Sequence, residues 1–136
     1  MTDTPFGFDT LQIHAGARPD PTTGARQTPI YQTTAYVFRD ADHAAKLFNL
    51  QEIGYIYSRL TNPTVSALAN RVVALEGGAG GIACSSGHAA QIMALFPLMQ
   101  PGRNVVASTR LYGGTIRQFS NTIRKFGWSA RFVDFD

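Results

Sequence analysis

The stretch of sequence that decides the fold is residues 81–108, GIACSSGHAAQIMALFPLMQPGRNVVAS. Its first four residues are small or apolar and predict a short strand. The Ser-Gly pair at 86–87 then predicts a turn into a helix, which extends to about Leu98 and ends before the Pro-Gly pair at 101–102. The run Asn104–Ser108, with two adjacent valines, predicts a second strand.

The same alternation continues downstream. A Gly-Gly pair at 113–114 leads into a predicted helix over 115–125, and Gly127 separates that helix from a predicted strand over 128–133. This order predicts parallel strands joined by right-handed crossovers, which defines the α/β class. A parallel sheet needs helices on both faces, and the helices predicted here would cover three strands poorly. We therefore expect the sheet to continue in chain beyond residue 136.

Residues 1 to about 35 show no regular pattern and are punctuated by glycines and prolines. An irregular stretch of this length is long for a compact domain. Disorder is the alternative, but Ile13, Ile30 and Tyr36 are among several apolar side chains that the stretch would have to bury. We therefore expect an arm that wraps around another surface.

Two helices are expected between the arm and the α/β stretch. Asp40 is placed to cap a short helix over 41–50. Residues 51–61 predict a loop or an extended segment. Asn62-Pro63 is typical of a helix start, with asparagine as the cap and proline in the first position, and Gly77-Gly78 predicts where this second helix ends.

The composition excludes several classes of function. Of the 136 residues 44% are hydrophobic and 15% charged, which is apolar for a small free-standing domain, so the chain has an extended buried interface or is a piece of something larger. The net charge of +3 comes from scattered basic residues, which gives little support to nucleic-acid binding. Cys84 is the one cysteine, and we expect it to be a buried small hydrophobic residue and not a nucleophile. No Cys/His spacing indicates a metal site.

We expect the protein to be located in a soluble, reducing compartment, by default the cytoplasm. The first nine residues carry two acids and no apolar core, so they do not resemble a secretory signal. No segment approaches the roughly 20 apolar residues that span a bilayer. We therefore expect no membrane partner.

The first candidate site is the turn around Ser86, Gly87 and His88. A helix N-terminus exposes unpaired N–H groups and a partial positive charge, which together bind phosphate, and Gly87 lets the backbone approach an anion closely. An ordinary serine cap with a turn glycine is the simpler explanation of these residues alone. The side chains of His88 and His14 are interpreted as structural, and His43 is expected on the surface of a helix.

Two further stretches carry aromatic and basic side chains. Tyr57 and Arg59 alternate in a segment expected to be extended, which would place both on one side, where a phenol and a guanidinium could share one anion. Tyr112 follows the predicted strand 104–108, at the end where α/β sheets collect ligands, and could stack on a flat ring. Loop tyrosines that pack on neighbours and an arginine that pairs with a surface acid remain the alternatives.

Taken together and in order, these stretches resemble the Cys/Met-metabolism family of pyridoxal-phosphate (PLP) enzymes. Within the family the resemblance is strongest to the O-acetylhomoserine sulfhydrylases, through the segment 44–52, and it covers essentially the whole chain. The matching pieces are residues 10–16, 29–38, 57–64, 75–78, 85–90 and 112–115.

The resemblance implies a fold and a set of roles. The fold would be an N-terminal arm and dimer-packing segment over 1–60, followed over 61–136 by the first part of the PLP-binding domain of the aspartate-aminotransferase-like, type I fold. Backbone N–H groups of Gly87 and His88 would hold the PLP phosphate, a contact that survives the change from the Met, Leu or Gln that many members carry in place of His88. Tyr112 would stack on the pyridine ring and assist proton transfer.

The resemblance also implies partners. Tyr57 and Arg59 would reach the phosphate of a neighbouring subunit, in a tetramer built as a dimer of dimers. The lysine that forms the Schiff base would lie beyond residue 136, because neither Lys46 nor Lys125 matches the family's lysine. PLP chemistry needs that amine. We therefore expect the chain to need a C-terminal remainder and to be inactive alone.

The implied reaction is γ-replacement, in which acetate leaves O-acetylhomoserine and sulfide adds to give homocysteine for methionine biosynthesis. The alternatives within the family are O-succinylhomoserine sulfhydrylase, cystathionine γ-synthase and γ-lyase. A different class of function stays open: a non-catalytic fragment or interaction module that pairs with a separate C-terminal chain.

Overall fold

The computed structural model of the chain describes residues 6–134, which fall into two compact units divided between Ala83 and Cys84. Residues 1–5, 135 and 136 lie outside the described residues. Residues 1–5 belong to the stretch that does not resemble a secretory signal. Among the helices described, none is both long and apolar enough to cross a membrane.

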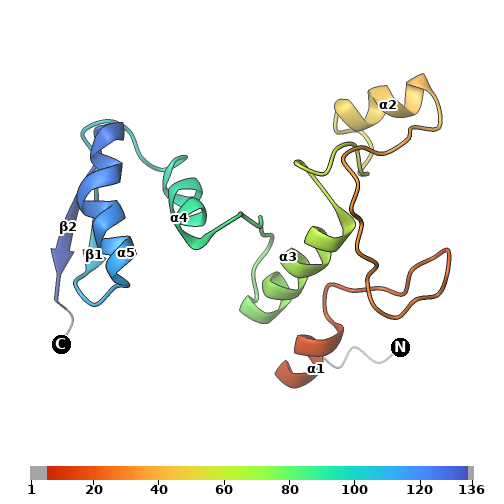
Figure 1. Cartoon of the computed structure of the whole chain (residues 1–136), viewed down its shortest axis with the longest axis horizontal. Coiled ribbons are helices and arrows are strands. Elements are labelled where there is room, and N and C mark those ends of the chain that lie inside the picture. The colour runs from red at the N-terminus through yellow and green to blue at the C-terminus, as the bar shows by residue number, and fades with distance from the viewer. Residues whose placement is uncertain (1–5, 135–136) are drawn as a thin grey trace. The chain divides into compact units, whose positions relative to one another are not determined.

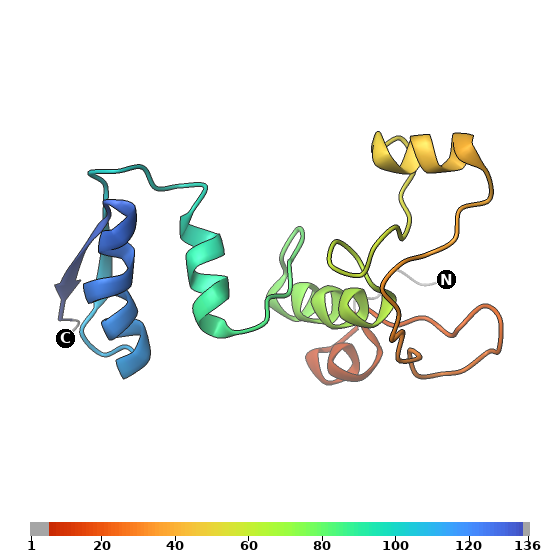
Figure 2. The ribbon, with the colours of Figure 1, turned by 45° about the horizontal axis from the view of Figure 1, so that its top comes forward.

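The first unit contains three helices, α1 (Phe8–His14), α2 (Ala41–Phe48) and α3 (Pro63–Glu76) (Figure 1). The prediction that residues 1–35 are irregular is wrong for α1. This helix has no side-chain cap, and a helix of seven residues is not stable by itself in water. It forms because it packs against α3, as Figures 1 and 2 both show, so tertiary contact supplies what the local sequence lacks.

Gly16 lets the chain leave α1 directly over α3. Its φ of +71° lies in the left-handed region, and a Cβ there would come within 2.5 Å of the backbone oxygen of Ala67 and the backbone nitrogen of Arg71. Arg71 closes the same contact by donating its Nε–H to the carbonyl oxygen of Ala15 at 2.8 Å. Only glycine satisfies both the conformation and the available space.

The caps of α2 and α3 confirm the predicted helix starts. The Asp40 side chain accepts the N–H of His43, and the Asn62 side chain accepts the N–H of Thr64. Helix α3 ends at Gly77 with a left-handed φ of 63°, as its Gly-Gly pair predicts. Helix α2 stops at Phe48, slightly before the expected end.

Hydrogen bonds fasten the second half of the arm to the start of α3. Thr64 donates its hydroxyl to the carbonyl of Pro29 and accepts the N–H of Tyr31, both at 2.9 Å. The Asn62 amide donates to the carbonyl of Tyr31 at 2.8 Å. An antiparallel bridge then joins Ala35 to Tyr57, so the arm also holds the segment that carries the tyrosine-arginine pair.

Asp20 organises the turn that follows α1. Its carboxylate accepts the N–H groups of Thr22 and Thr23, the hydroxyl of Thr23, and the hydroxyl of Tyr31. These bonds, led by the Thr23 N–H, hold the pKa of the Asp20 carboxyl below its ordinary value of 3.8. The bond to Asp20 in turn raises the pKa of the Tyr31 hydroxyl above 10.0, because it favours the protonated phenol.

The second unit contains α4 (Gly87–Leu95), β1 (Asn104–Ser108), α5 (Gly113–Arg117) and β2 (Ser129–Val133). Strands β1 and β2 pair in parallel, in a register from Asn104 opposite Ser129 to Ser108 opposite Val133, which confirms the predicted parallel pairing. A buried cluster forms its core: Ala107, Phe119, Ile123 and Trp128. Since Phe119 and Ile123 lie on the connection between the strands, the core packs that connection onto the sheet.

Two expectations for this region are wrong in detail. Residues 81–84 are not a strand, and Ile82 is 82% exposed, so the sheet within residues 6–134 has two strands. A strand needs a neighbour for its backbone bonds, and an apolar run alone does not supply one. The helix expected over 115–125 is a short α-helix, α5, followed by a π-helical turn, η1 (Gln118–Thr122), and a 3-10 turn, η2 (Ile123–Phe126).

The first prediction concerns the contact of α1 with α3. Gly16→Ala should lower the free energy of unfolding by about 3 kcal/mol, since ~1 kcal/mol of left-handed strain adds to ~1–3 kcal/mol of overpacking against α3. Urea unfolding followed by circular dichroism measures the loss. Gly24→Ala is the matched control, because Gly24 has a φ of +70° and open space around its Cβ position. Equal losses in the two variants would show that the close approach to α3 contributes nothing.

The second prediction concerns Asp20. Because its folded-state pKa is lowered, the hold of the ionised carboxylate on the turn is present above pH 3.8 and is lost as the pH falls through the lowered pKa. Thr23→Val removes one hydroxyl donor and should move the pKa back toward 3.8, as measured by NMR titration of the Asp20 carboxyl. Thr28→Val changes a threonine without a bond to Asp20 and should leave that pKa in place. An unchanged pKa in Thr23→Val would refute the assignment.

Candidate functional site

The N-terminus of α4 presents two backbone donors to its surroundings. Ser86 caps the helix from an extended conformation and accepts the N–H of Ala89 at 3.2 Å. Among the described residues, the N–H groups of Gly87 and His88 have no acceptor. A Cβ built on Gly87 would meet nothing within 4 Å, so an anion could approach both donors.

An exposed tyrosine lies next to this helix start. Tyr112 is the cap residue of α5, and its side chain is 76% exposed. Its ring centroid lies 6.1 Å from that of His88, with 31° between the ring planes. A Cβ on Gly114 would come within 2.5 Å of the Tyr112 ring and 2.9 Å of the His88 ring, so the glycine leaves room for both. The structure thus brings Gly87, His88 and Tyr112 together.

Two side-chain amides, of the buried Gln118 and the half-buried Gln91, join α4 to the helix that follows Tyr112. Gln118 donates its Nε2–H to the carbonyl of His88 at 3.0 Å, and Gln91 donates to the hydroxyl of Thr115 at 2.9 Å. Both Thr115 and Gln118 are buried. No pattern in the sequence singled out these residues. Thr115 and Gln118 are three apart and share a helix face, but a polar pair at that spacing ordinarily indicates a solvated face.

Tyr57 and Arg59 meet, although not in the predicted way. The segment is a turn rather than an extended strand, because the carbonyl of Tyr57 accepts the N–H groups of Leu60 and Thr61 at 2.9 and 3.1 Å. The turn places the Arg59 guanidinium over the Tyr57 ring, 5.4 Å from its centroid. Both side chains are exposed, so the first unit presents a paired phenol and guanidinium to its surroundings.

The burial and contacts of three further side chains can be compared with the expectations from the sequence. His43 was expected on a helix surface, but its side chain is only 16% exposed, and its Nδ1 accepts the N–H of Arg39. Cys84 is half-buried rather than buried, with its Sγ 3.5 Å from the Sδ of Met93. His14 contacts Arg26 within the arm, with its Nδ1 2.6 Å from a guanidinium nitrogen.

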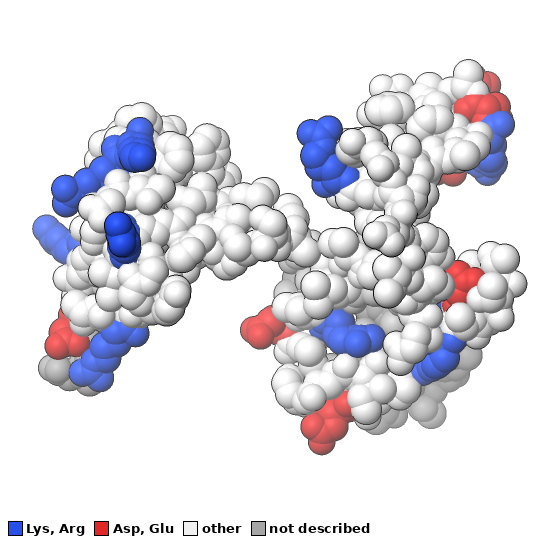
Figure 3. Space-filling model, viewed as in Figure 1, with Lys and Arg blue, Asp and Glu red and all other residues white. Residues whose placement is uncertain are grey.

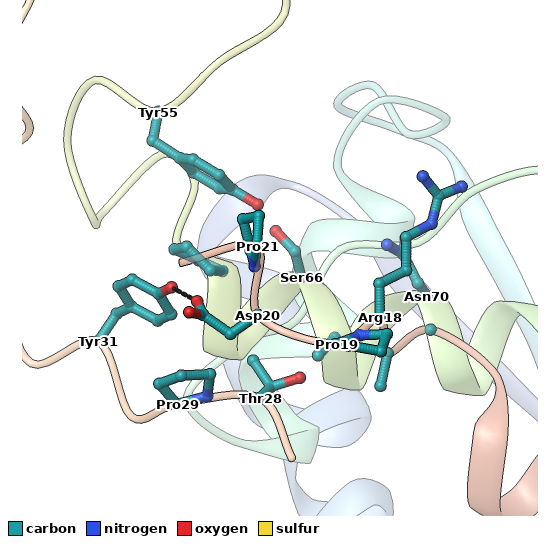
Figure 4. A pocket seen from close by; sticks show the side chains of 14 residues that line it. Arg18, Pro19, Asp20, Pro21, Thr28, Pro29, Tyr31, Tyr55, Ser66 and Asn70 are labelled. Atoms are coloured by element: carbon teal, nitrogen blue, oxygen red, sulfur yellow. Dashed lines mark hydrogen bonds between the residues drawn. The ribbon is translucent and has the colours of Figure 1, made fainter. Parts of the chain in front are cut away.

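The first unit also contains a cavity of about 540 Å³ that the sequence analysis did not anticipate. Figure 4 shows its wall, where the hydroxyl of Tyr31 donates to Asp20 beside Pro21 and Tyr55. Most of the lining comes from the arm and from α3. Elsewhere on the face in Figure 3, the basic side chains are scattered rather than gathered in one patch.

Comparison with known proteins adds to this geometry. Residues 9–136 match the family described as Cys/Met metabolism PLP-dependent enzyme. The O-acetyl-L-homoserine sulfhydrylase 1 of Thermus thermophilus is 55% identical over 126 residues, which are 93% of this chain and 30% of that protein. The chain therefore spans about a third of the length of the curated relatives it matches.

Solved structures agree in fold. A Campylobacter jejuni protein assigned as an O-acetylhomoserine (thiol)-lyase, solved with pyridoxyl-lysine phosphate, matches with a TM-score of 0.88 and 47% identity, over 95% of this chain and 32% of that one. The cystathionine γ-lyase of Lactobacillus plantarum matches with a TM-score of 0.79 and 33% identity, over 95% and 31%. These matches confirm the expected start of a type I, α/β PLP fold. The chain belongs to the Cys/Met metabolism family of PLP-dependent enzymes.

Proposed function

We propose that this chain is the N-terminal part of an O-acetylhomoserine sulfhydrylase, which replaces the acetate of O-acetylhomoserine by sulfide to give homocysteine in methionine biosynthesis. One observation carries the proposal: the two free N–H groups of Gly87 and His88 lie beside the exposed ring of Tyr112. This pairing of an anion site with a flat aromatic surface fits a phosphorylated heteroaromatic cofactor.

The residues present fit PLP. The N–H groups of Gly87 and His88 would bind its phosphate at the positive end of α4. Tyr112 would stack on the pyridine ring, and its hydroxyl would assist proton transfer at the leaving group. When bound, PLP supplies the electron sink for charge that develops on the substrate. The side chains of this chain orient the cofactor and handle the proton.

Tyr57 and Arg59 serve the phosphate of a neighbouring subunit in this proposal. The guanidinium supplies charge and a fork of donors, and the contact with the Tyr57 ring limits its freedom. Exposed apolar side chains on the same unit support an assembly that covers them, notably Ile30 and Val37, which are 85% and 96% exposed. We propose a homotetramer formed as a dimer of dimers, located in the cytoplasm.

The division of the complete protein follows from the same proposal. Residues 1–60 form the arm and dimer-packing segment, and residues 61–136 begin the PLP-binding domain. Lys46 lies on α2, and Lys125 lies in η2, beyond η1 from the helix that Tyr112 caps. Neither matches the lysine of the family, so the lysine that attaches the cofactor would come from a C-terminal remainder, as would most of the pocket for the substrate.

The closest rival is a γ-lyase of the same family. The likeness is greater to the sulfhydrylases, at 55% identity to the Thermus thermophilus protein and 47% to the Campylobacter jejuni protein, than to the cystathionine γ-lyase, at 33%. This order favours γ-replacement by sulfide. Use of the succinyl ester, or of cysteine as in cystathionine γ-synthase, is tested by the same assay.

The third prediction tests the reaction. The complete protein should convert O-acetylhomoserine and sulfide to homocysteine faster than it uses the succinyl ester or cysteine. Residues 1–136 alone should show no turnover, and borohydride should fix no PLP on Lys46 or Lys125, because neither matches the lysine that carries PLP in the family. Mass spectrometry locates any modified lysine. Release of an α-keto acid without homocysteine would replace the proposal by a γ-lyase.

The fourth prediction tests the paired side chains. In the complete protein, Arg59→Met should raise the dissociation constant of PLP about tenfold, which corresponds to the loss of one charged hydrogen bond, and Arg59→Lys should recover only part of it. Fluorescence titration of the cofactor-free protein measures the constant. Arg39→Met is the control, since Arg39 pairs with Glu52 on the same unit and should leave PLP affinity unchanged. Equal affinities for Arg59→Met and the wild type would leave the pair with a packing role only.

A further inference from the structure

We propose that Gln118 is a positioning residue for the phosphate site, and that it acts by holding the first turn of α4 through the carbonyl of His88. The inference rests on the proposed function, because it assigns the phosphate to the N–H groups of Gly87 and His88. It extends that function to a residue on a different helical segment, η1.

The hydrogen bond between Gln118 and His88 can have only one direction. A backbone carbonyl can only accept, so the amide nitrogen of Gln118, and not its oxygen, must face the carbonyl of His88, 3.0 Å away. A carbonyl has two lone pairs, and the helix needs only one of them. The bond can therefore add to the helical bond of His88 without replacing it.

Burial makes this bond a firm one. Gln118 is only 9% exposed, and the interior weakens competition from solvent. The oxygen of the same amide is buried and has no hydrogen-bond partner among the described residues. A buried, unpaired oxygen costs about 1–3 kcal/mol, which a methionine of similar length would not incur. The amide is thus poor as a packing group, and its useful feature is the N–H that it donates to His88.

The helical geometry aims Gln118 at α4. Gln118 is the first residue of the π-helical turn that follows α5, and Phe119 is the second. Phe119 enters the core with Ile123 and Trp128, while the Gln118 side chain reaches the first turn of α4. Wide turns of this kind are rare and often occur at functional sites.

The consequence for ligand binding is specific. Gln118 touches the residue whose N–H group would bind phosphate, whereas Tyr112 would contact the ring at the other end of the cofactor. Loss of the amide frees the first turn of α4 to shift, which weakens the phosphate bonds and leaves the ring contact. The neighbouring contact of Gln91 with Thr115 lies further along α4, away from the phosphate donors.

The experiment compares PLP with pyridoxal, which lacks the phosphate. In the complete, cofactor-free protein, Gln118→Met should raise the dissociation constant of PLP about tenfold and leave that of pyridoxal within a factor of two. The ³¹P resonance of bound PLP should shift as well. Gln91→Met is the matched control: it also removes an amide whose nitrogen donates one hydrogen bond and whose oxygen is buried and unpaired among the described residues, so it should change stability to a similar extent without changing the ratio of the two constants.

A second variant keeps the test decisive if Gln118→Met does not fold. Gln118→Leu also lacks the donor and adds no charge beside the phosphate, so it should show the same selective loss of PLP affinity. Equal weakening of PLP and pyridoxal in a folded Gln118 variant would overturn the positioning role while the proposed function stands. Failure of the wild-type protein to prefer PLP over pyridoxal would instead remove the phosphate site itself.

Discussion

The packing of α4 against the segment that begins with α5 is the constraint on which the candidate site depends. The site needs two things held at a fixed separation: backbone donors for an anion and a flat ring for an aromatic ligand. The donors belong to α4, and the ring belongs to Tyr112, which caps α5. The amide of Gln118 and the absence of a side chain at Gly114 set how closely the first turn of α4 approaches Tyr112, and Gln91 joins the same elements further along α4.

The parallel sheet supports this arrangement, because its core anchors the segment that contacts α4. Strands β1 and β2 pair in parallel, and the connection between them carries Phe119 and Ile123 into the core against Trp128. Gln118 directly precedes Phe119, so the residue that reaches α4 is anchored by its neighbour in the core. The position of the N–H groups of Gly87 and His88, the proposed phosphate ligands, is thus linked to the packing of the sheet through a few consecutive residues.

The first unit is organised by a different principle, which is attachment of the arm to α3. Gly16 lets the start of the arm approach α3 closely. Thr64 and Asn62, at the start of α3, bind the second half of the arm by hydrogen bonds. These contacts position the turn with Tyr57 and Arg59 while many apolar side chains stay exposed. Such a surface is typical of a part that other chain covers, in keeping with relatives of about three times this length.

The sequence by itself determined the α/β class, the starts of α2, α3 and α4 and the strand 104–108, because caps, turn glycines and apolar periods act over a few residues. The family was recognised from the resemblance of several stretches taken in order. Tertiary structure alone decided the rest. Helix α1 exists through α3, residues 81–84 lack a strand partner, and the tyrosine-arginine pair meets through a turn. Gln118 could not be recognised from its neighbours, because its role depends on a carbonyl 30 positions away that only folding brings within 3.0 Å.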